Sequence, residues 1–189
     1  MMILLNGPFG IGKTTVARLL AERISGALVY DPELVGALLR NVLRPIDPVA
    51  DFQEYSLWCP VVVDLAQRLT ETYRRPLIIP MTLWRREHFE TIVNGLRSID
   101  ETLVCVRLTA SRATLVQRIL ARPDDEGSHA WCLAHLDVGL AAAADPTFGI
   151  EVSTEGRSPA EVAEDIIRVS RAPAVDRAPR PRAGGGAEA

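Results

Sequence analysis

The sequence contains few cysteines and few aromatic residues, and it has no long apolar run. Its 189 residues include 3 cysteines, and aromatic residues make up 5% of the chain. Cys59, Cys105 and Cys132 are widely spaced and form no CxxC pair, which argues against a zinc site and against a disulfide framework. No segment approaches the roughly 18 apolar residues that a membrane-spanning helix needs. We therefore expect no transmembrane segment.

The chain also lacks a strong excess of either charge. Its 24 acidic and 21 basic residues give a formal net charge of −3, so the composition gives no reason to expect a nucleic acid partner. The apolar stretch at the N-terminus has no basic region before it, and we expect no signal peptide. The composition predicts a reduced, cytoplasmic protein whose length suits a single domain.

One motif carries most of the chemical information. Residues 7–14 read Gly-Pro-Phe-Gly-Ile-Gly-Lys-Thr, which matches the phosphate-binding pattern GxxxxGK[ST]. In this pattern backbone N–H groups cradle phosphate oxygens, Lys13 reaches the β- and γ-phosphates, and the Thr14 hydroxyl holds Mg²⁺. The motif predicts ATP and Mg²⁺ as cofactors. The residues expected to bind the nucleotide are Gly7, Phe9, Gly10, Ile11, Gly12, Lys13, Thr14 and Thr15.

Short apolar runs alternate with helical patterns along the chain. We expect strands at 2–5, 28–30, 77–79, 103–108 and 150–153, and helices between them, one of which spans 131–140. This alternation predicts an α/β fold: a single P-loop NTPase domain with a five-stranded parallel sheet and helices on both faces. The domain is placed at residues 1–170, with a short lid at about 118–130. Residues 171–189 are rich in Ala, Pro, Arg and Gly and are expected to form a disordered tail.

Polar residues that follow the predicted strands are candidates for catalysis, because ligands bind at the carboxyl edge of such sheets. Asp31 follows the second strand, where a carboxylate can deprotonate an acceptor hydroxyl. It can also cap the helix that Pro32 begins, and one carboxylate can do both. That helix would carry Leu34, Leu38, Leu39 and Val42. Arg40 on the same helix has two open interpretations, contact with substrate or exposure to solvent.

Arginines near the predicted lid are candidates for stabilising a transferring phosphoryl group. Arg118 and Arg122 are four residues apart, so one helical face can present both guanidinium groups to phosphate oxygens. Arg112 lies in the first turn of the same helix and is less suited to that role. The alternative for each residue is a solvated helix face.

The acceptor side has a weaker signal. Phe52, Tyr55, Trp58, Met81 and Trp84 form a local concentration of large side chains, which could line an acceptor pocket or pack in the core. Thr82 follows the third strand, where many P-loop proteins have an aspartate that helps to hold Mg²⁺. A motor-type or switch-type NTPase is thus disfavoured, and we expect Mg²⁺ to rest on Thr14, the phosphates and water.

These residues together resemble the tunicamycin resistance (TmrB-like) family. The resemblance covers roughly residues 2–170 and rests on 3–14, on Tyr30-Asp31-Pro32-Glu33 with Gly36 and Arg40, on Asp51-Phe52-Gln53 with Trp58, on Pro80-Met81-Thr82-Leu83, on 115–122 and on Asp145-Pro146-Thr147-Phe148. It implies an ATP-binding protein of the nucleoside/nucleotide kinase-like fold, linked to resistance against tunicamycin, a lipid-linked uracil nucleoside antibiotic. It also implies that Thr82 is a family trait, and by analogy with antibiotic phosphotransferases that Asp31 stands at the position of the base.

The leading functional hypothesis is an ATP-dependent small-molecule kinase. Lys13, Asp31, Arg118 and Arg122 would be its catalytic residues, and Arg40, Phe52, Trp58, Thr82 and Trp84 would contact the acceptor, tunicamycin or another nucleoside-like compound. Two alternatives remain open. One is a metabolic nucleotide or sugar-acid kinase, and the other is an ATP-dependent protein that sequesters a drug without modifying it.

Overall fold

The computed structural model describes residues 1–123 and 127–172. The elements in chain order are β1 (Met2–Asn6), α1 (Lys13–Arg23), β2 (Leu28–Val29), α2 (Pro32–Leu43), η1 (Phe52–Glu54), α3 (Trp58–Tyr73), β3 (Leu77–Met81), α4 (Arg86–Ile99), β4 (Val104–Thr109), α5 (Arg112–Leu120), α6 (Ser128–Ala134), α7 (Leu136–Ala144), η2 (Pro146–Phe148), β5 (Ile150–Ser153) and α8 (Pro159–Arg171). The predicted tail lies outside the described residues except for 171 and 172. Residues 124–126 of the predicted lid also lie outside them.

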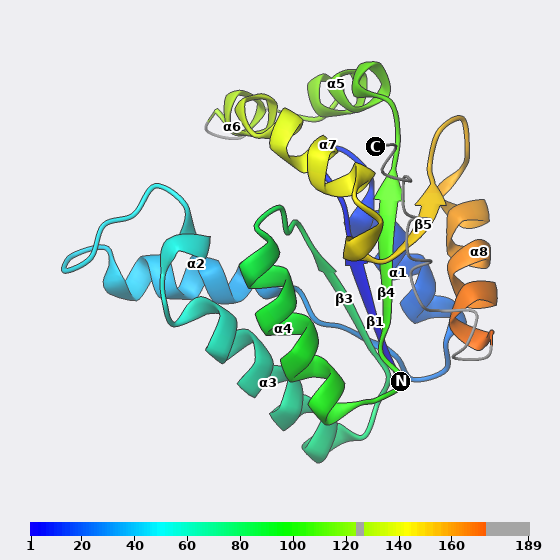
Figure 1. The fold of residues 1–189 in the computed structure, drawn as a ribbon, viewed down its shortest axis with the longest axis horizontal. Helices are drawn as coiled ribbons and strands as arrows, with labels where there is room; N and C mark the ends of the chain where they lie inside the picture. Colours follow the sequence, from blue (N-terminus) through cyan, green and yellow to red (C-terminus); the bar gives the residue numbers. More distant parts are fainter. Residues whose placement is uncertain (124–126, 173–189) are drawn as a thin grey trace, which may run out of the picture.

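The strands form one parallel sheet in the order β2-β3-β1-β4-β5. Helices α3 and α4 cover one face of this sheet, and α1 and α8 cover the other (Figure 1). Helices α5, α6 and α7 lie at the end toward which β4 and β5 point (Figure 1). The predicted α/β fold, with five parallel strands and helices on both faces, is confirmed.

The central strand β1 explains why the sheet has two cores. Its side chains alternate between the faces, as strand geometry requires. Met2 and Leu4 pack with α3 and α4, whereas Ile3 and Leu5 pack with α1 and α8. All four are buried, and each contributes about 1.5–3 kcal/mol to stability through burial. The strand is held between β3 and β4, and its carboxyl end fixes where the P-loop starts.

Side-chain caps fix the starts of two helices, and the first of them is the predicted cap at Asp31. The Asp31 carboxylate accepts a hydrogen bond of 2.9 Å from the backbone N–H of Glu33, and Pro32 occupies the first helical position of α2. At α8 the Ser158 hydroxyl accepts from the backbone N–H of Glu161, and the Glu161 carboxylate accepts from the N–H of Ser158 in return. Such caps contribute about 1 kcal/mol each, and they fix where the two helices begin.

The apolar residues expected on the helix after Asp31 do not all face the core. Leu34, Leu38 and Val42 are 70%, 60% and 62% exposed. The helix packs instead through Val35, Gly36 and the partly buried Leu39. A Cβ at Gly36 would overlap the ring of Phe52, so the absence of a side chain lets η1 lie directly against α2. Spacing alone could not select the packed side, because the apolar residues of α2 cover most of its circumference.

The single helix expected over 131–140 is also wrong, because α6 and α7 divide it. His135 separates them with φ −102° and ψ 6°, outside the helical region. Its ring lies 3.9 Å from the ring of Trp131 and 5.7 Å from that of Trp84, measured between centroids. The chain therefore changes direction at a residue whose ring packs between two tryptophans.

Gly149, at the start of the last strand, allows a stability prediction. It has φ 124° and ψ −172°, a conformation that essentially only glycine adopts, and a Cβ there would overlap the carbonyl oxygen of Cys105. We expect Gly149→Ala to lower the free energy of unfolding by at least about 3 kcal/mol, measured by urea denaturation.

Gly156→Ala is the matched control for this prediction. Gly156 also has a positive φ, of 63°, but no heavy atom lies within 4 Å of the position a Cβ would take. We expect Gly156→Ala to lower the free energy of unfolding by only about 1 kcal/mol, which is the cost of the backbone conformation alone. Equal losses in the two variants would show that the contact with Cys105 does not contribute.

Candidate functional site

The P-loop lies between the carboxyl end of β1 and the start of α1. Gly10 and Gly12 have φ values of 77° and 96°, in the left-handed region that favours glycine. A Cβ at Gly10 would lie 2.8 Å from Ile119 on α5, so the loop passes directly against that helix. Gly12 is the residue before α1, which means that the first free N–H groups of the helix open toward the loop.

Asn6 fixes the beginning of the loop, and the sequence reasoning did not assign it a role. Its carboxamide oxygen accepts hydrogen bonds of 2.8 Å from the backbone N–H groups of Gly7 and Leu83. Its amide donates at 3.0 Å to the Leu83 carbonyl. The side chain is 2% exposed, so these bonds are shielded from water. The P-loop and the segment after β3 are thereby held in one arrangement. A polar residue ending an otherwise apolar strand was the signal in the sequence.

A cavity of about 250 Å³ opens over the loop. Its lining residues are Phe9, Gly10, Gly12, Lys13, Thr14, Thr15, Glu33 and Arg122. Most of these are P-loop residues, and Glu33 and Arg122 are contributed by α2 and by the segment after α5. We call this space the phosphate cavity.

Lys13 and Glu33 modify each other's electrostatics in the phosphate cavity. Burial lowers the pKa of Lys13 to about 8, and the nearby Glu33 carboxylate opposes this shift. Burial likewise raises the pKa of Glu33 above its ordinary value, while Lys13 opposes it. The Nζ of Lys13 donates to the carbonyl oxygens of Gly7 at 2.8 Å and Pro8 at 3.1 Å. A phosphate anion in the cavity would restore the charged form of the lysine.

The oxygen atoms around the phosphate cavity fit a magnesium ion. Thr14 lines it, and a hydroxyl oxygen is a hard ligand of the kind that Mg²⁺ prefers. Within residues 1–123 and 127–172, no three His, Cys, Asp or Glu side chains gather as a metal cluster. Most of the coordination would therefore come from the phosphates and water, as is usual for Mg²⁺ at nucleotide sites.

Asp31 and Glu33 have different surroundings, although only one residue separates them. Asp31 caps α2 with one carboxylate oxygen and lines a groove between β2, α2 and α3. Glu33 lines the phosphate cavity and receives the Thr82 hydroxyl at 3.5 Å. Sequence reasoning placed a catalytic carboxylate at Asp31. The geometry makes Glu33, which the sequence gave only as part of a motif, the carboxylate that faces the P-loop.

A second cavity, of about 300 Å³, lies on the other side of the loop. Its lining residues are Ile11, Gly12, Thr15, Val16, Arg118, Thr154, Arg157, Pro159 and Val162. It shares Gly12 and Thr15 with the phosphate cavity, so a ligand with phosphates in the first space can extend into the second. We call this space the base cavity.

The two lid arginines point to different cavities. Arg118 donates at 2.9 Å to both the hydroxyl and the carbonyl oxygen of Thr154, and it lines the base cavity. Arg122 lines the phosphate cavity and contacts the Cys132 sulfur at 3.5 Å. The expectation that one helical face presents both is wrong, because α5 ends at Leu120. Arg112 forms an exposed ion pair of 3.0 Å with Asp137.

The residues predicted to contact the acceptor fall into two groups, and Trp58, Phe52 and Arg40 lie away from the P-loop. Trp58 is fully buried, and its indole N–H donates at 3.1 Å to the Pro32 carbonyl, so it is a core residue that supports the start of α2 rather than a pocket wall. Phe52 packs edge-on against Trp58, with ring centroids 5.3 Å apart. Arg40 is exposed and donates at 3.2 Å to the Ala50 carbonyl, bracing the loop before η1.

Thr82, Trp84 and Gln53 lie closer to the P-loop. Thr82 is 3% exposed, with its hydroxyl toward Glu33 and its carbonyl oxygen accepting from the Gln53 amide at 2.9 Å. The carboxamide oxygen of the buried Gln53 has no partner among the described residues. The ring of Trp84 lies 6.1 Å from that of Phe9 in the P-loop. Polar groups thus continue from the phosphate cavity through Glu33 and Thr82 to Gln53.

A family model described as an AAA domain matches residues 2–146 of this chain. The chain belongs to the AAA domain family. The matched segment contains the P-loop, Glu33, Thr82 and both lid arginines. No curated protein matches the chain at a significant level. Among the described helices, none has the length and apolar character needed to cross a bilayer.

Solved structures of a tunicamycin resistance protein and of several kinases have the same fold as this chain. The tunicamycin resistance protein of Deinococcus radiodurans is 24% identical, with 95% of this chain and 98% of that chain covered and a TM-score of 0.72. A sugar kinase from Janibacter sp. HTCC2649 is 16% identical, with 94% and 95% covered and a TM-score of 0.61. A shikimate kinase from Acinetobacter baumannii, in complex with shikimate, is 17% identical, with 89% and 91% covered and a TM-score of 0.56. The resemblance to the tunicamycin resistance family is thus confirmed at the level of the fold, which is P-loop kinase-like.

Proposed function

We propose that this protein is an ATP-dependent small-molecule kinase that transfers the γ-phosphoryl group to a hydroxyl of a nucleoside-like acceptor, with tunicamycin-type antibiotics as the first candidates. The observation that carries the proposal is the lining of the phosphate cavity, where Glu33 stands with Lys13, Thr14 and Arg122. Nucleotide binding alone needs the loop and its lysine. A carboxylate of raised pKa on the acceptor side is what a kinase needs in addition.

The residues divide the reaction as follows. Glu33 accepts the proton of the acceptor hydroxyl while the hydroxyl oxygen bonds to the γ-phosphorus. The bond from that phosphorus to the β,γ-bridging oxygen breaks, and its electron pair leaves with ADP. Lys13, the loop N–H groups and Arg122 offset the charge on the phosphoryl oxygens. Thr14 would hold Mg²⁺, which when bound neutralises charge on the β- and γ-phosphates.

The acceptor class is supported by sequence resemblance and by the acceptor side of the site. The resemblance to the tunicamycin resistance family extends beyond the P-loop to Asp31-Pro32-Glu33 and Pro80-Met81-Thr82. The first segment contributes Glu33 to the lining of the phosphate cavity, and the second contributes the Thr82 hydroxyl that lies 3.5 Å from Glu33. The hydroxyl of Thr82 and the carboxylate of Glu33 add hydrogen-bonding groups of the kind that a polar acceptor needs. These observations favour a polar, nucleoside-like acceptor.

A mass spectrum of tunicamycin after incubation with the protein, ATP and Mg²⁺ tests the proposal. We expect a product heavier by one phosphoryl group, and no such product with the Lys13→Ala variant. Unmodified drug that is neither altered nor retained by the protein would rule out tunicamycin as the acceptor. The same assay with nucleosides, gluconate and shikimate would then distinguish a metabolic kinase.

Sequestration without modification is the second candidate, and Thr82 favours it. At the end of β3, where many P-loop enzymes have a metal-binding aspartate, this chain has a hydroxyl. A binding protein needs ATP to order its site but no efficient phosphoryl transfer. Unmodified tunicamycin that co-elutes with the protein in the presence of ATP would support this function over the kinase.

A further inference from the structure

The base cavity is walled mainly by aliphatic side chains. Ile11 and Val16 come from the P-loop side, and Pro159 and Val162 come from the start of α8. Ile11, Val16 and Val162 are each no more than 2% exposed, so the wall is part of the core rather than a mobile surface. Its charged and polar side chains are Arg118, Arg157, Thr15 and Thr154. A side chain that is already hydrogen-bonded within the protein is not available to pair with the hydrogen-bonding edge of a base. The partners of these groups therefore matter for base selectivity.

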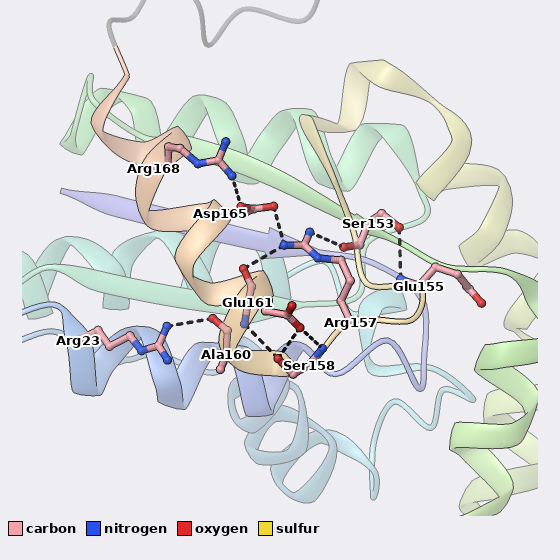
Figure 2. A network of polar contacts seen from close by, with 9 residues as sticks. All are labelled: Arg23, Ser153, Glu155, Arg157, Ser158, Ala160, Glu161, Asp165 and Arg168. Atoms are coloured by element: carbon pink, nitrogen blue, oxygen red, sulfur yellow. Dashed lines mark hydrogen bonds and ion pairs between the residues drawn. The ribbon is translucent and has the colours of Figure 1, made fainter.

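Arg157 is fully engaged by its own loop and by α8. Figure 2 shows its guanidinium between three oxygen atoms: it donates at 3.1 Å to the carbonyl oxygens of Ser153 and Glu161, and it pairs at 2.7 Å with the Asp165 carboxylate. Asp165 also pairs with Arg168 (Figure 2). These contacts engage both terminal nitrogens of the Arg157 guanidinium and fix the shape of the loop from 153 to 158.

Arg118 and Thr154 are hydrogen-bonded to each other in the wall of the cavity. Thr154 accepts both hydrogen bonds from Arg118, and its own N–H donates at 2.8 Å to the carbonyl oxygen of Thr109. Ser153 uses its hydroxyl to accept from the N–H of Glu155 (Figure 2). Two nitrogens of the Arg118 guanidinium are therefore held in place, which leaves a planar cationic face for stacking on a ring. Every nucleic acid base offers such a ring face.

We propose that this protein binds the base of its nucleotide by stacking and shape alone, and consequently uses GTP about as well as ATP. The inference rests on the proposed function, since it requires a nucleoside triphosphate at the P-loop. Adenine and guanine differ in the groups on their hydrogen-bonding edge. A site that pairs with such an edge rejects the wrong ligand by about 10⁴–10⁵-fold, whereas an apolar wall separates similar ligands by about 10–200-fold at most.

Isothermal titration calorimetry with the non-hydrolysable analogues AMP-PNP and GMP-PNP, in the presence of Mg²⁺, tests the inference without any acceptor. We expect the two Kd values to agree within about tenfold. A GMP-PNP affinity more than about 200-fold weaker would overturn the inference while leaving nucleotide binding, and so the proposed function, intact. Failure of both analogues to bind would instead contradict the proposed function, and the inference with it.

Two arginine variants separate stacking from a general loss of structure. Arg118→Leu should weaken both analogues by the same factor, because the guanidinium face contacts either ring alike. Arg112→Leu is the matched control on the same helix, where the side chain forms only an exposed ion pair with Asp137, and it should leave both Kd values unchanged. A loss confined to one analogue in Arg118→Leu would mean that the arginine reads the edge of the base, contrary to the proposal.

Discussion

Replacing Glu33 by Gln is expected to lower kcat for phosphoryl transfer by a factor of about 10²–10⁴ while nucleotide affinity is retained. Gln has nearly the shape of Glu, but it cannot accept the proton of the acceptor hydroxyl. The reason to select Glu33 is its place in the phosphate cavity beside Lys13 and within 3.5 Å of the Thr82 hydroxyl. The measurement is steady-state release of ADP with the acceptor found by mass spectrometry, together with calorimetric binding of AMP-PNP.

Asp31→Asn is the matched control, at the N-cap of α2 two residues before Glu33. Asn is as good a helix cap as Asp, so α2 should begin normally in this variant. We expect kcat to stay close to that of the unmodified protein, because Asp31 lines the groove beside β2 and not the phosphate cavity. A large loss in Asp31→Asn with little change in Glu33→Gln would return the role of the base to Asp31, the residue that sequence reasoning selected.

The pH profile gives a second readout for Glu33. Burial raises the pKa of this carboxyl above its ordinary value, and only the ionised form can accept a proton. Activity should therefore be lost as the pH falls through that raised pKa, at a higher pH than an exposed glutamate would give. Glu33→Gln should remove this acid limb from whatever activity remains. An acid limb unchanged in the variant would assign it to another group.

Replacing Arg122 by Gln is expected to lower kcat by a factor of about 10³, the low end of the range for arginines that contact a transferring phosphoryl group. Arg122 lines the phosphate cavity with Lys13, so its charge would act on the γ-phosphate as negative charge spreads over the oxygens. The nucleotide KM should change little, because an interaction made mainly in the transition state lowers kcat. Single-turnover measurements at saturating ATP check this directly.

Arg118→Gln is the comparison for Arg122. Arg118 lines the base cavity and is held by Thr154, so its loss should raise the nucleotide KM and leave kcat nearly unchanged. The two variants thus differ in which kinetic constant moves. If Arg122→Gln raised KM alone, Arg122 would be a binding residue and the catalytic role proposed for it would be wrong. Thermal midpoints of both variants establish that each is folded.

Sequence reasoning succeeded where local chemistry decides the outcome. The P-loop, the parallel alternation and the Asp31 cap depend on neighbours in the chain, and all are present. It failed where long-range packing decides. The side of α2 that is buried depends on the close approach of Phe52 to Gly36, which leaves Leu34 exposed. The sequence around α2 does not indicate this contact.

The candidate site follows the same division. Motif spacing identified Lys13 and Thr14, but the choice between Asp31 and Glu33 depends on which side of α2 faces the P-loop. Likewise, Arg118 and Arg122 were assigned together by their spacing, although the end of α5 at Leu120 sends them to different cavities. Asn6 was missed because its role depends on hydrogen bonds to the backbone of Leu83, which lies 77 residues away in the sequence.

The half-buried Lys13 has a practical consequence, because it is the only lysine in the chain. With a pKa of about 8, a substantial share of this amine is neutral and nucleophilic in mildly alkaline buffer. The other amine is the N-terminus, which pairs with Asp100 at 2.9 Å on the far side of β1 from the loop. Acylating reagents would therefore mark a single internal position, and a bound triphosphate would shield it. The extent of acylation at Lys13, measured by mass spectrometry of one peptide, would therefore report whether the P-loop is occupied. This measurement does not require the acceptor to be known.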